Sequence, residues 1–85
     1  MTTNEGKKIG EITHFYGKIK VGIIKLSSAL KDGDNIRIIG GETDFDQSVQ
    51  SMEIEGKKVN KAQKGDVIGL EFSQKVREGY EVYKV

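Results

Sequence analysis

Apolar and polar residues alternate along several short stretches of the chain, which predicts β-strands. Ile19, Val21 and Ile23 repeat at a period of two, and Ile24 and Leu26 continue the apolar pattern in the opposite phase. Such a change of phase predicts a β-bulge within this strand. No stretch of ten residues has the 3.6-residue period of a helix. We therefore expect about six strands, at 9–15, 18–26, 35–39, 49–55, 67–72 and 82–85.

The segments between these strands are rich in glycine and polar residues. Tyr16-Gly17 is interpreted as a hairpin tip, with Gly17 supplying a positive φ. Residues 27–34 are expected to form a connection with room for one helical turn. A polar loop is predicted at 42–46, with Phe45 as its apolar anchor. The expected organisation is a polar tail at 1–8 followed by one domain at 9–85.

One short pattern occurs three times. Leu30-Lys-Asp-Gly33-Asp34 is repeated as Ala62-Gln-Lys-Gly65-Asp66, and more weakly as Val76-Arg-Glu-Gly79-Tyr80. In each copy an apolar or small residue stands three positions before a glycine, and a strand follows. We interpret the pattern as a tight turn in which the glycine takes a positive φ, the aspartate caps backbone N–H groups and the apolar residue plugs the core.

Composition and charge reduce the number of possible fold classes and of possible binding partners. Ten Ile and seven Val stand against three Leu and two Ala, a balance that favours strands over helices. The expected fold is an all-β domain, a single closed or nearly closed antiparallel barrel of six or seven strands. Fourteen Lys and Arg nearly balance thirteen Asp and Glu, so any nucleic-acid contact needs a local basic patch. Neither a secretion signal nor a membrane span is visible, and a cytoplasmic protein is expected.

The sequence offers little catalytic chemistry. It has one histidine, His14, and no cysteine, which removes most nucleophile–base pairs and zinc sites. Its glycines never form a phosphate-binding loop, so no GTP binding is expected. Asp44 and Asp46 flank Phe45, but two carboxylates alone predict a solvated loop tip rather than a calcium site. We expect no enzyme activity, no cofactor and no metal.

Two stretches are candidates for binding. The first hairpin brings aromatic and cationic side chains together at His14, Tyr16, Lys18 and Lys20, a composition suited to stacking on bases and holding phosphates. The alternative is that Phe15 belongs to the core, Tyr16 covers the end of the barrel and the lysines only keep the surface soluble. A second basic stretch, which has the alternative of a merely solvated loop, contains Lys57, Lys58, Lys61 and Lys64.

The order of these motifs resembles a known family. The segment from Leu30 to Gly40, the strand Val49–Ile54 and the stretch Val59–Leu70 are similar to the β-barrel domain II of translational GTPases such as elongation factor Tu. Small stand-alone proteins described as translation elongation factor-like resemble the chain more closely, in Ile12-Thr-His-Phe-Tyr, Thr43-Asp-Phe-Asp-Gln47 and Val76–Val85. A similar module also closes some larger peptidase-like enzymes.

The resemblance implies a non-enzymatic module of protein biosynthesis that binds RNA (tRNA or rRNA) or a translation-related protein. The chain departs from the family in having no GTPase domain, and in having Phe15-Tyr-Gly-Lys18 where the elongation factors have Gly-Arg-Gly. The family's RNA-contacting positions therefore do not transfer. The alternative function is a protein–protein interaction module that docks on an enzyme or a larger assembly. The oligomeric state stays open.

Overall fold

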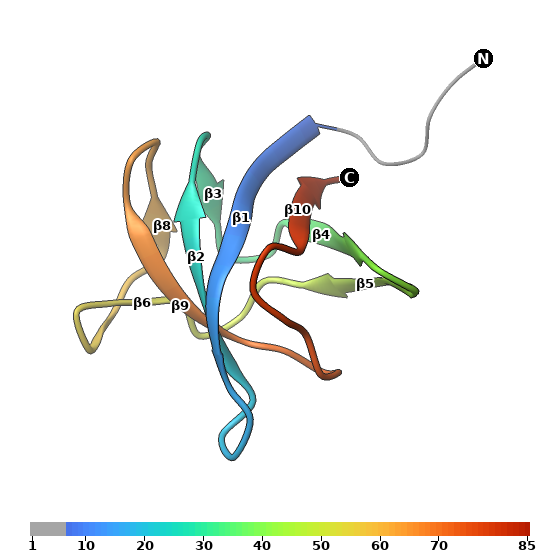
Figure 1. Ribbon diagram of the computed structural model, residues 1–85. Helices are drawn as coiled ribbons and strands as arrows, with labels where there is room; N and C mark the ends of the chain where they lie inside the picture. The colour runs from blue at the N-terminus through green and yellow to red at the C-terminus, as the bar shows by residue number, and fades with distance from the viewer. Residues whose placement is uncertain (1–6) are drawn as a thin grey trace.

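The computed structural model describes residues 7–85, which form strands and turns without a helix (Figure 1). Eight strands form one antiparallel sheet in the order β5-β4-β10-β1-β2-β9-β6-β7, and β3 and β8 form a separate two-stranded ribbon. The strands are β1 (Lys7–Tyr16), β2 (Val21–Leu26), β3 (Leu30–Lys31), β4 (Asn35–Gly40), β5 (Thr43–Ser48), β6 (Glu53–Ile54), β7 (Lys57–Lys58), β8 (Lys61–Ala62), β9 (Val67–Glu71) and β10 (Glu81–Lys84).

The all-β antiparallel prediction is confirmed, but the closed barrel of six or seven strands is wrong. Strands β5 and β7 stand at the two ends of the sheet and do not pair with each other. The side chain of Gln47 in β5 spans the opening instead. Its Nε2 donates to the carbonyl oxygen of Glu71 at 2.9 Å, and its Oε1 accepts from the N–H of Ser73 at 2.9 Å. These two side-chain hydrogen bonds connect β5 to the end of β9 without a pairing of strands.

The irregular pairing lies in β1, whereas the sequence placed it in the second strand. The register of β1 shifts between Lys8 and Gly10 against β10, and between Ile12 and His14 against β2. These shifts explain how Ile9 and Ile12, three residues apart, both point into the core. Strand β2 pairs with β9 without any shift. Its residues therefore alternate regularly, and Val21 and Ile23 face away from the core.

Two connections also differ from prediction. The β1–β2 hairpin has a four-residue loop at 17–20, because Tyr16 pairs with Val21, and the positive φ belongs to Lys20 (56°), not to Gly17. The connection at 27–34 contains the short strand β3 and no helical turn. Strand β1 starts at Lys7, so the predicted tail at 1–8 overlaps it by two residues, and residues 1–6 lie outside the described residues.

The predicted loop at 42–46 is a strand, and the predicted strand at 49–55 is mostly not one. Gly40 pairs with Thr43, which leaves a two-residue turn in which Gly41 has a φ of 55°. Strand β5 follows, and its buried Phe45 lies opposite Ile38. In the 49–55 segment the chain bends at Ser51, whose φ is 60°. Only the two residues of β6 are strand there.

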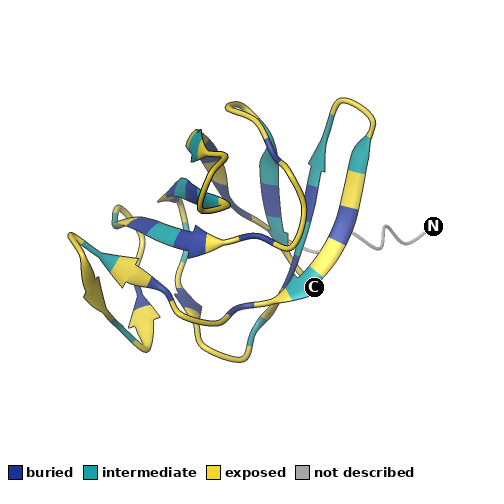
Figure 2. Ribbon diagram, turned by 90° about the horizontal axis from the view of Figure 1, so that it is seen from below, coloured by how far each residue is buried: buried dark blue, intermediate teal, exposed yellow. Residues whose placement is uncertain are grey.

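The core fills the space enclosed by the curved sheet, as the alternating buried and exposed segments in Figure 2 show. Among residues 7–85 no polar or charged residue is buried. A close packing contact joins Phe72 to Gly22 of β2: a Cβ atom at position 22 would lie 2.4 Å from the Phe72 ring. The buried apolar residues are Ile9, Ile12, Ile24, Leu26, Leu30, Ile36, Ile38, Phe45, Val49, Met52, Ala62, Ile68, Leu70, Phe72, Val76 and Val82.

The three repeated motifs are confirmed as turns of one kind. Their glycines, at 33, 65 and 79, have φ values of 90°, 94° and 91°. Asp34 accepts the N–H of Lys31 through its side chain, as Asp66 does that of Gln63. The apolar residues of the motifs, at 30, 62 and 76, are buried.

Each of the three turns also makes the same pair of backbone hydrogen bonds to a buried residue. The glycine N–H donates to that residue's carbonyl oxygen, and its N–H donates in return to the carbonyl oxygen of the residue after the glycine. The buried partners are Val49 for the turn at Gly33, Leu26 for Gly65 and Ile12 for Gly79, with distances of 2.7–3.0 Å. The motif therefore fixes three turns to three different parts of the core.

Candidate functional site

The structure distributes the eight predicted binding residues over separate surfaces. His14 and Tyr16 lie on the outer side of β1, whereas Lys18 lies in the loop that follows it. Lys20 lines a groove beside Gln47 and Phe72. Lys57 and Lys58 form β7 at one end of the sheet, while Lys61 and Lys64 line another groove near β3 and β8. In Figure 1 the β1–β2 hairpin extends at the bottom, far from the ribbon of β3 and β8.

The two aromatic side chains of the hairpin contact each other. The rings of His14 and Tyr16 lie edge to face with their centroids 4.4 Å apart. Nδ1 of His14 lies 3.2 Å from Oε2 of Glu78, and the two side chains are 50% and 66% exposed. His14 is therefore paired with a carboxylate and does not join a cluster of lysines.

The outer side of strands β1, β2 and β9 carries a group of apolar side chains that the core does not use. Ile23 lies opposite His14 on one side and Gly69 on the other. In the next row Val21 lies opposite Tyr16. Directly opposite residues project on the same side of a sheet. We call this surface the apolar face, and it consists of Tyr16, Val21, Ile23, Val67 and Gly69.

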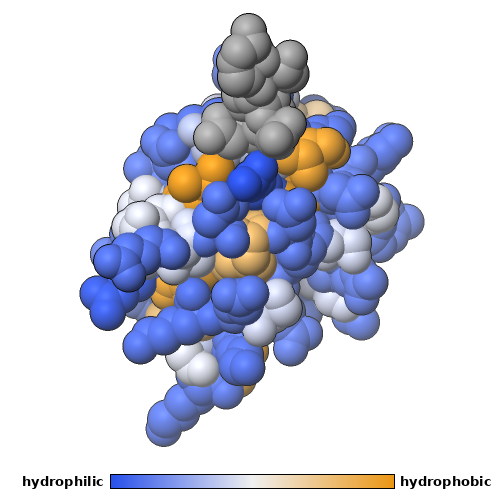
Figure 3. All heavy atoms as spheres, turned by 90° about the vertical axis from the view of Figure 1, so that its right-hand side faces the viewer, coloured by the Kyte–Doolittle hydropathy of each residue, from blue (hydrophilic) through white to orange (hydrophobic). Residues whose placement is uncertain are grey.

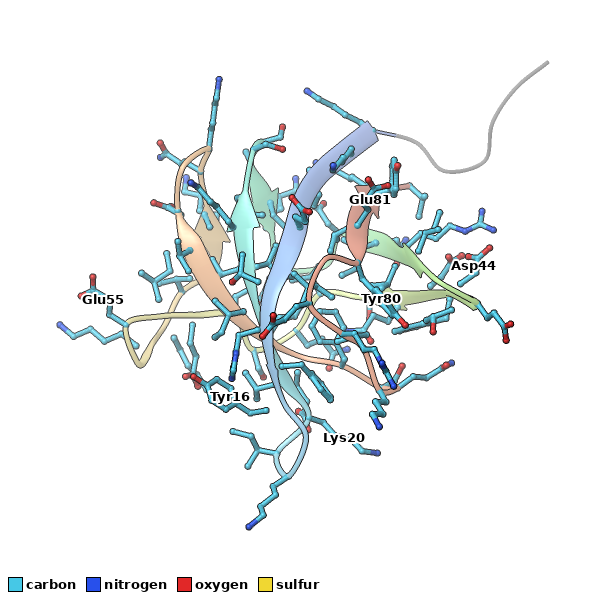
Figure 4. The ribbon with its side chains drawn as sticks, in the orientation of Figure 1. Tyr16, Lys20, Asp44, Glu55, Tyr80 and Glu81 are labelled. Carbon is cyan, nitrogen blue, oxygen red and sulfur yellow. The ribbon has the colours of Figure 1, made fainter. Side chains whose placement is uncertain are left out.

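The apolar face is hollowed along β2, β6 and β9 into a groove of about 580 Å³. Val67 is 49% exposed beside it. Gly69 has no side chain, which leaves the groove open at this position. A Cβ atom there would lie 3.6 Å from Val21, an ordinary van der Waals distance. Three carboxylates, Glu53, Glu55 and Asp66, line the groove together with the apolar residues, and no lysine of residues 7–85 does. Figure 4 shows Tyr16 and Glu55 on the same side of the molecule, away from Asp44.

Sequence reasoning missed this face because it assigned Val21, Ile23, Ile24 and Leu26 to one apolar pattern interrupted by a bulge. A signal was present: Val21-Gly-Ile23-Ile24-Lys-Leu26 carries apolar residues in both phases of a strand. Apolar residues in both phases are typical of a strand that is buried on both faces. In this molecule the core covers only one face of β2. The regular pairing of β2 with β9 then shows which phase faces outward.

Ion pairs cover the surface formed by β4, β5 and β10. Arg37 donates from Nε and Nη2 to the two carboxylate oxygens of Asp44, at 2.7 and 2.8 Å. Lys8 and the hydroxyl of Tyr83 donate to Glu81 at 3.2 and 2.8 Å. The Arg37 hydrogen bond lowers the pKa of Asp44, and the Tyr83 and Lys8 hydrogen bonds lower the pKa of Glu81. Figure 3, which views the right-hand side of Figure 1, shows a mostly hydrophilic surface with small apolar groups.

Acidification below about pH 5 should lower the free energy of unfolding partly through Asp44 and Glu81. Because the folded chain lowers both pKa values, their contribution is full above the ordinary values of 3.8 and 4.5 and is lost as the pH falls through the folded values. Chemical denaturation at a series of pH values checks this. The Asp44→Asn/Glu81→Gln double variant should lose less stability on acidification; an equal loss would contradict the assignment.

Neither a metal site nor a membrane-spanning helix is found in the described part of the chain. Residues 7–85 contain no group of three His, Cys, Asp or Glu side chains placed to hold a metal ion. They also contain no helix long and apolar enough to cross a membrane.

The chain is similar in sequence to part of a larger protein. No model of a known protein family matches it. Over 77 residues, which are 89% of the chain, it is 43% identical to an uncharacterized protease of Methanocaldococcus jannaschii. The chain spans only 19% of the length of that protease.

Two solved structures share the fold. Both are crystal structures of the C-terminal domain of a Geobacillus thermoleovorans protein described as a U32 peptidase, one of them as a selenomethionine variant. Each has a TM-score of 0.87 and 14% sequence identity to this chain. The alignments cover 92% and 100% of this chain, and 99% and 98% of the two domains.

These findings correct the interpretation of the chain as a translation elongation factor-like protein, and with it the predicted RNA-binding role in protein biosynthesis. Three of the motifs behind that interpretation are turns in which a glycine of positive φ precedes a strand. Local backbone geometry requires them, so they do not distinguish one family of small β-domains from another. The chain has the fold of a U32 peptidase C-terminal domain.

Proposed function

We propose that this domain is a non-enzymatic docking module that binds a peptidase-like domain through its apolar face. The observation that carries the proposal is the apolar surface on the outside of β2 and β9, which no part of residues 7–85 covers. Tyr16 and Val67 are each 49% exposed there. Val21 and Ile23 of β2 lie between Tyr16 of β1 and Val67 of β9, and they connect these two exposed side chains into one surface.

The arrangement of the face fits a protein partner. Stable protein interfaces have an apolar centre surrounded by a polar rim. Here aliphatic side chains occupy the centre, and charged residues lie around it. Tyr16 adds an aromatic ring with a polar end, a side chain that is common in such interfaces. The hollow beside Gly69 offers a place for a projecting apolar side chain of the partner.

The charges indicate what should surround that projecting side chain. Glu53, Glu55 and Asp66 line the groove, and Glu71 lies opposite Val21 in the pairing of β9 with β2. A complementary partner presents Lys or Arg around an apolar centre. A nucleic-acid backbone is repelled by the same carboxylates. The groove of the apolar face is thus better suited to a basic protein surface than to RNA.

The comparisons support a peptidase-like domain as that partner. The related protease of M. jannaschii joins a stretch 43% identical to this chain to a much longer remainder, since the match covers 19% of it. The fold recurs as the C-terminal domain of a protein described as a U32 peptidase. A domain joined to such a remainder needs a surface to pack on it, and the apolar face supplies one.

The test is an NMR titration of the isotope-labelled chain with the M. jannaschii protease from which the 77 matching residues have been deleted. Amide signals of residues 14–25 and 65–71 should shift. Ile23→Asp and Val67→Asp should each weaken binding by about tenfold or more, because each buries a charge at the centre of the interface. The intact protease, whose own copy occupies the docking site, should bind more weakly.

Ile19→Asp is the matched control. Ile19 is 62% exposed in the loop after β1 and does not line the groove of the apolar face, so its substitution should leave the affinity unchanged. Shifts confined to β3, β8 and their turns would overturn the proposal. So would the absence of binding by a truncated protease that circular dichroism shows to be folded.

A further inference from the structure

A second groove, on a different surface, is lined by lysines. It has a volume of about 730 Å³ and lies where the ribbon of β3 and β8 meets the start of β1 and the end of β10. Its floor is aliphatic, because the buried Leu30 and Ala62 form part of its lining. Its sides carry five lysines, and we call it the lysine groove: Lys7, Lys31, Lys61, Lys64 and Lys84.

The positive charge of this groove is largely uncompensated. Among residues 7–85, Asp34 is the only carboxylate that lines it. That carboxylate is 3.3 Å from Nζ of Lys84, and it also accepts the backbone N–H of Lys31 at 3.0 Å. Within residues 7–85 the side chains of the other four lysines have no ion pair. The chain as a whole has a net charge of only +1, so the groove is a local concentration of charge.

The lining favours an acidic peptide over a nucleic acid. Single-stranded nucleic acids are held by aromatic side chains that stack on bases together with cations that hold phosphates. In the described part of the chain, no aromatic or arginine side chain lines the lysine groove. The hairpin that carries His14 and Tyr16 lies at the far end of the molecule (Figure 1). An extended peptide instead places carboxylates beside the lysines and aliphatic carbons on the floor.

We propose that the lysine groove binds an extended, acidic segment of a protein partner. The proposal does not depend on the apolar face, because that face lies at the other end of β1 and on β2 and β9, and its groove is lined by carboxylates. Several flexible ammonium groups along a groove suit a ligand with charges spread along its length. The affinity should be modest and should fall as salt screens the lysines.

The test is an amide NMR titration of the chain with hexaglutamate at low and moderate salt. Shifts should concentrate on residues 27–34 and 61–66 and weaken with added salt. The Lys31→Gln/Lys61→Gln/Lys64→Gln variant should bind about tenfold more weakly. The matched control is Lys18→Gln/Lys20→Gln/Lys57→Gln, which removes the same charge outside the groove and should change affinity less than twofold. All six side chains are exposed, so both variants should keep the wild-type spectrum.

Three results would overturn the proposal. Equal weakening by both triple variants would show attraction to net charge without a site. Tighter binding of a single-stranded oligonucleotide of equal charge would assign the groove to nucleic acid. Full competition by inorganic phosphate would indicate a site for a single anion. None of these results bears on the protease titration, which reports on residues of the apolar face.

Discussion

Replacing Gly22 with alanine should lower the free energy of unfolding by about 1–3 kcal/mol, because the core has no space for the added methyl group. Gly22 is the second residue of β2, and β2 lies between β1 and β9. Its added Cβ would lie 2.4 Å from Cε2 and 3.0 Å from Cδ2 of Phe72. The Phe72 ring is itself buried, so it can move only by displacing other core side chains. Chemical denaturation followed by circular dichroism measures the change.

Gly69→Ala provides the matched control. Gly69 lies in β9, the strand next to β2 in the same sheet. Neither Gly22 nor Gly69 has a positive φ. The added Cβ at position 69 meets Val21 at 3.6 Å and Ile23 at 3.8 Å, which are ordinary contacts. This variant should be neutral or more stable by up to about 1 kcal/mol, since alanine restricts the unfolded chain more than glycine does. Equal destabilisation by both variants would contradict the packing described for Phe72.

Alanine at Gly33, Gly65 or Gly79 should cost about 1–2 kcal/mol of stability at each position. Nothing lies within 4 Å of an added Cβ at any of the three glycines, but all three have φ values near 90°. The cost therefore comes from backbone strain, with no contribution from steric overlap with neighbouring residues. The three turns form hydrogen bonds to different core residues. The losses in the free energy of unfolding should therefore add in the triple variant. Thermal and chemical denaturation give the values.

Gly17→Ala separates this effect from the general cost of replacing a loop glycine. Gly17 lies in the β1–β2 loop, its φ is not positive, and an added Cβ would touch only the Phe15 ring at 3.9 Å. The stability should change by less than about 0.5 kcal/mol. A large loss at Gly17, or no loss at the three turn glycines, would show that these turns do not have the backbone geometry described above.

Features of the fold that depend on local chemistry were predictable from the sequence. The three turns follow from an apolar residue, a glycine and, in two cases, an aspartate at fixed spacing, and their φ values and caps agree. The β-class follows from the abundance of Ile and Val. The bulges in β1 were not predictable, because they depend on how β1 pairs with β2 and β10. Strand β5 was missed because Asp44 and Asp46 suggested a loop, whereas Asp44 pairs with Arg37 across the hairpin.

The candidate surfaces were less accessible to sequence reasoning. His14 and Tyr16 were chosen for their chemistry, but their neighbours come from the pairing of β1 with β2. Those neighbours are aliphatic, which changes the expected partner from RNA to protein. The lysine stretch at 57–64 is divided between β7 and the lysine groove. That groove also takes Lys7, Lys31 and Lys84 from three distant parts of the chain, and no spacing along the sequence indicates their proximity.

The pairing of β1 with β10 determines how this domain can be joined to other polypeptides. Lys7 lies opposite Lys84, so the described chain begins and ends on neighbouring strands about 5 Å apart. Lys7 and Lys84 lie at the same edge of the domain, beside the lysine groove and on the side opposite the β1–β2 hairpin (Figure 1). The same proximity allows a circular permutant in which a short linker joins the two ends and new termini open in the exposed loop at 17–20. Strand ends this close together are the geometry that allows a domain to be inserted within a loop of another protein.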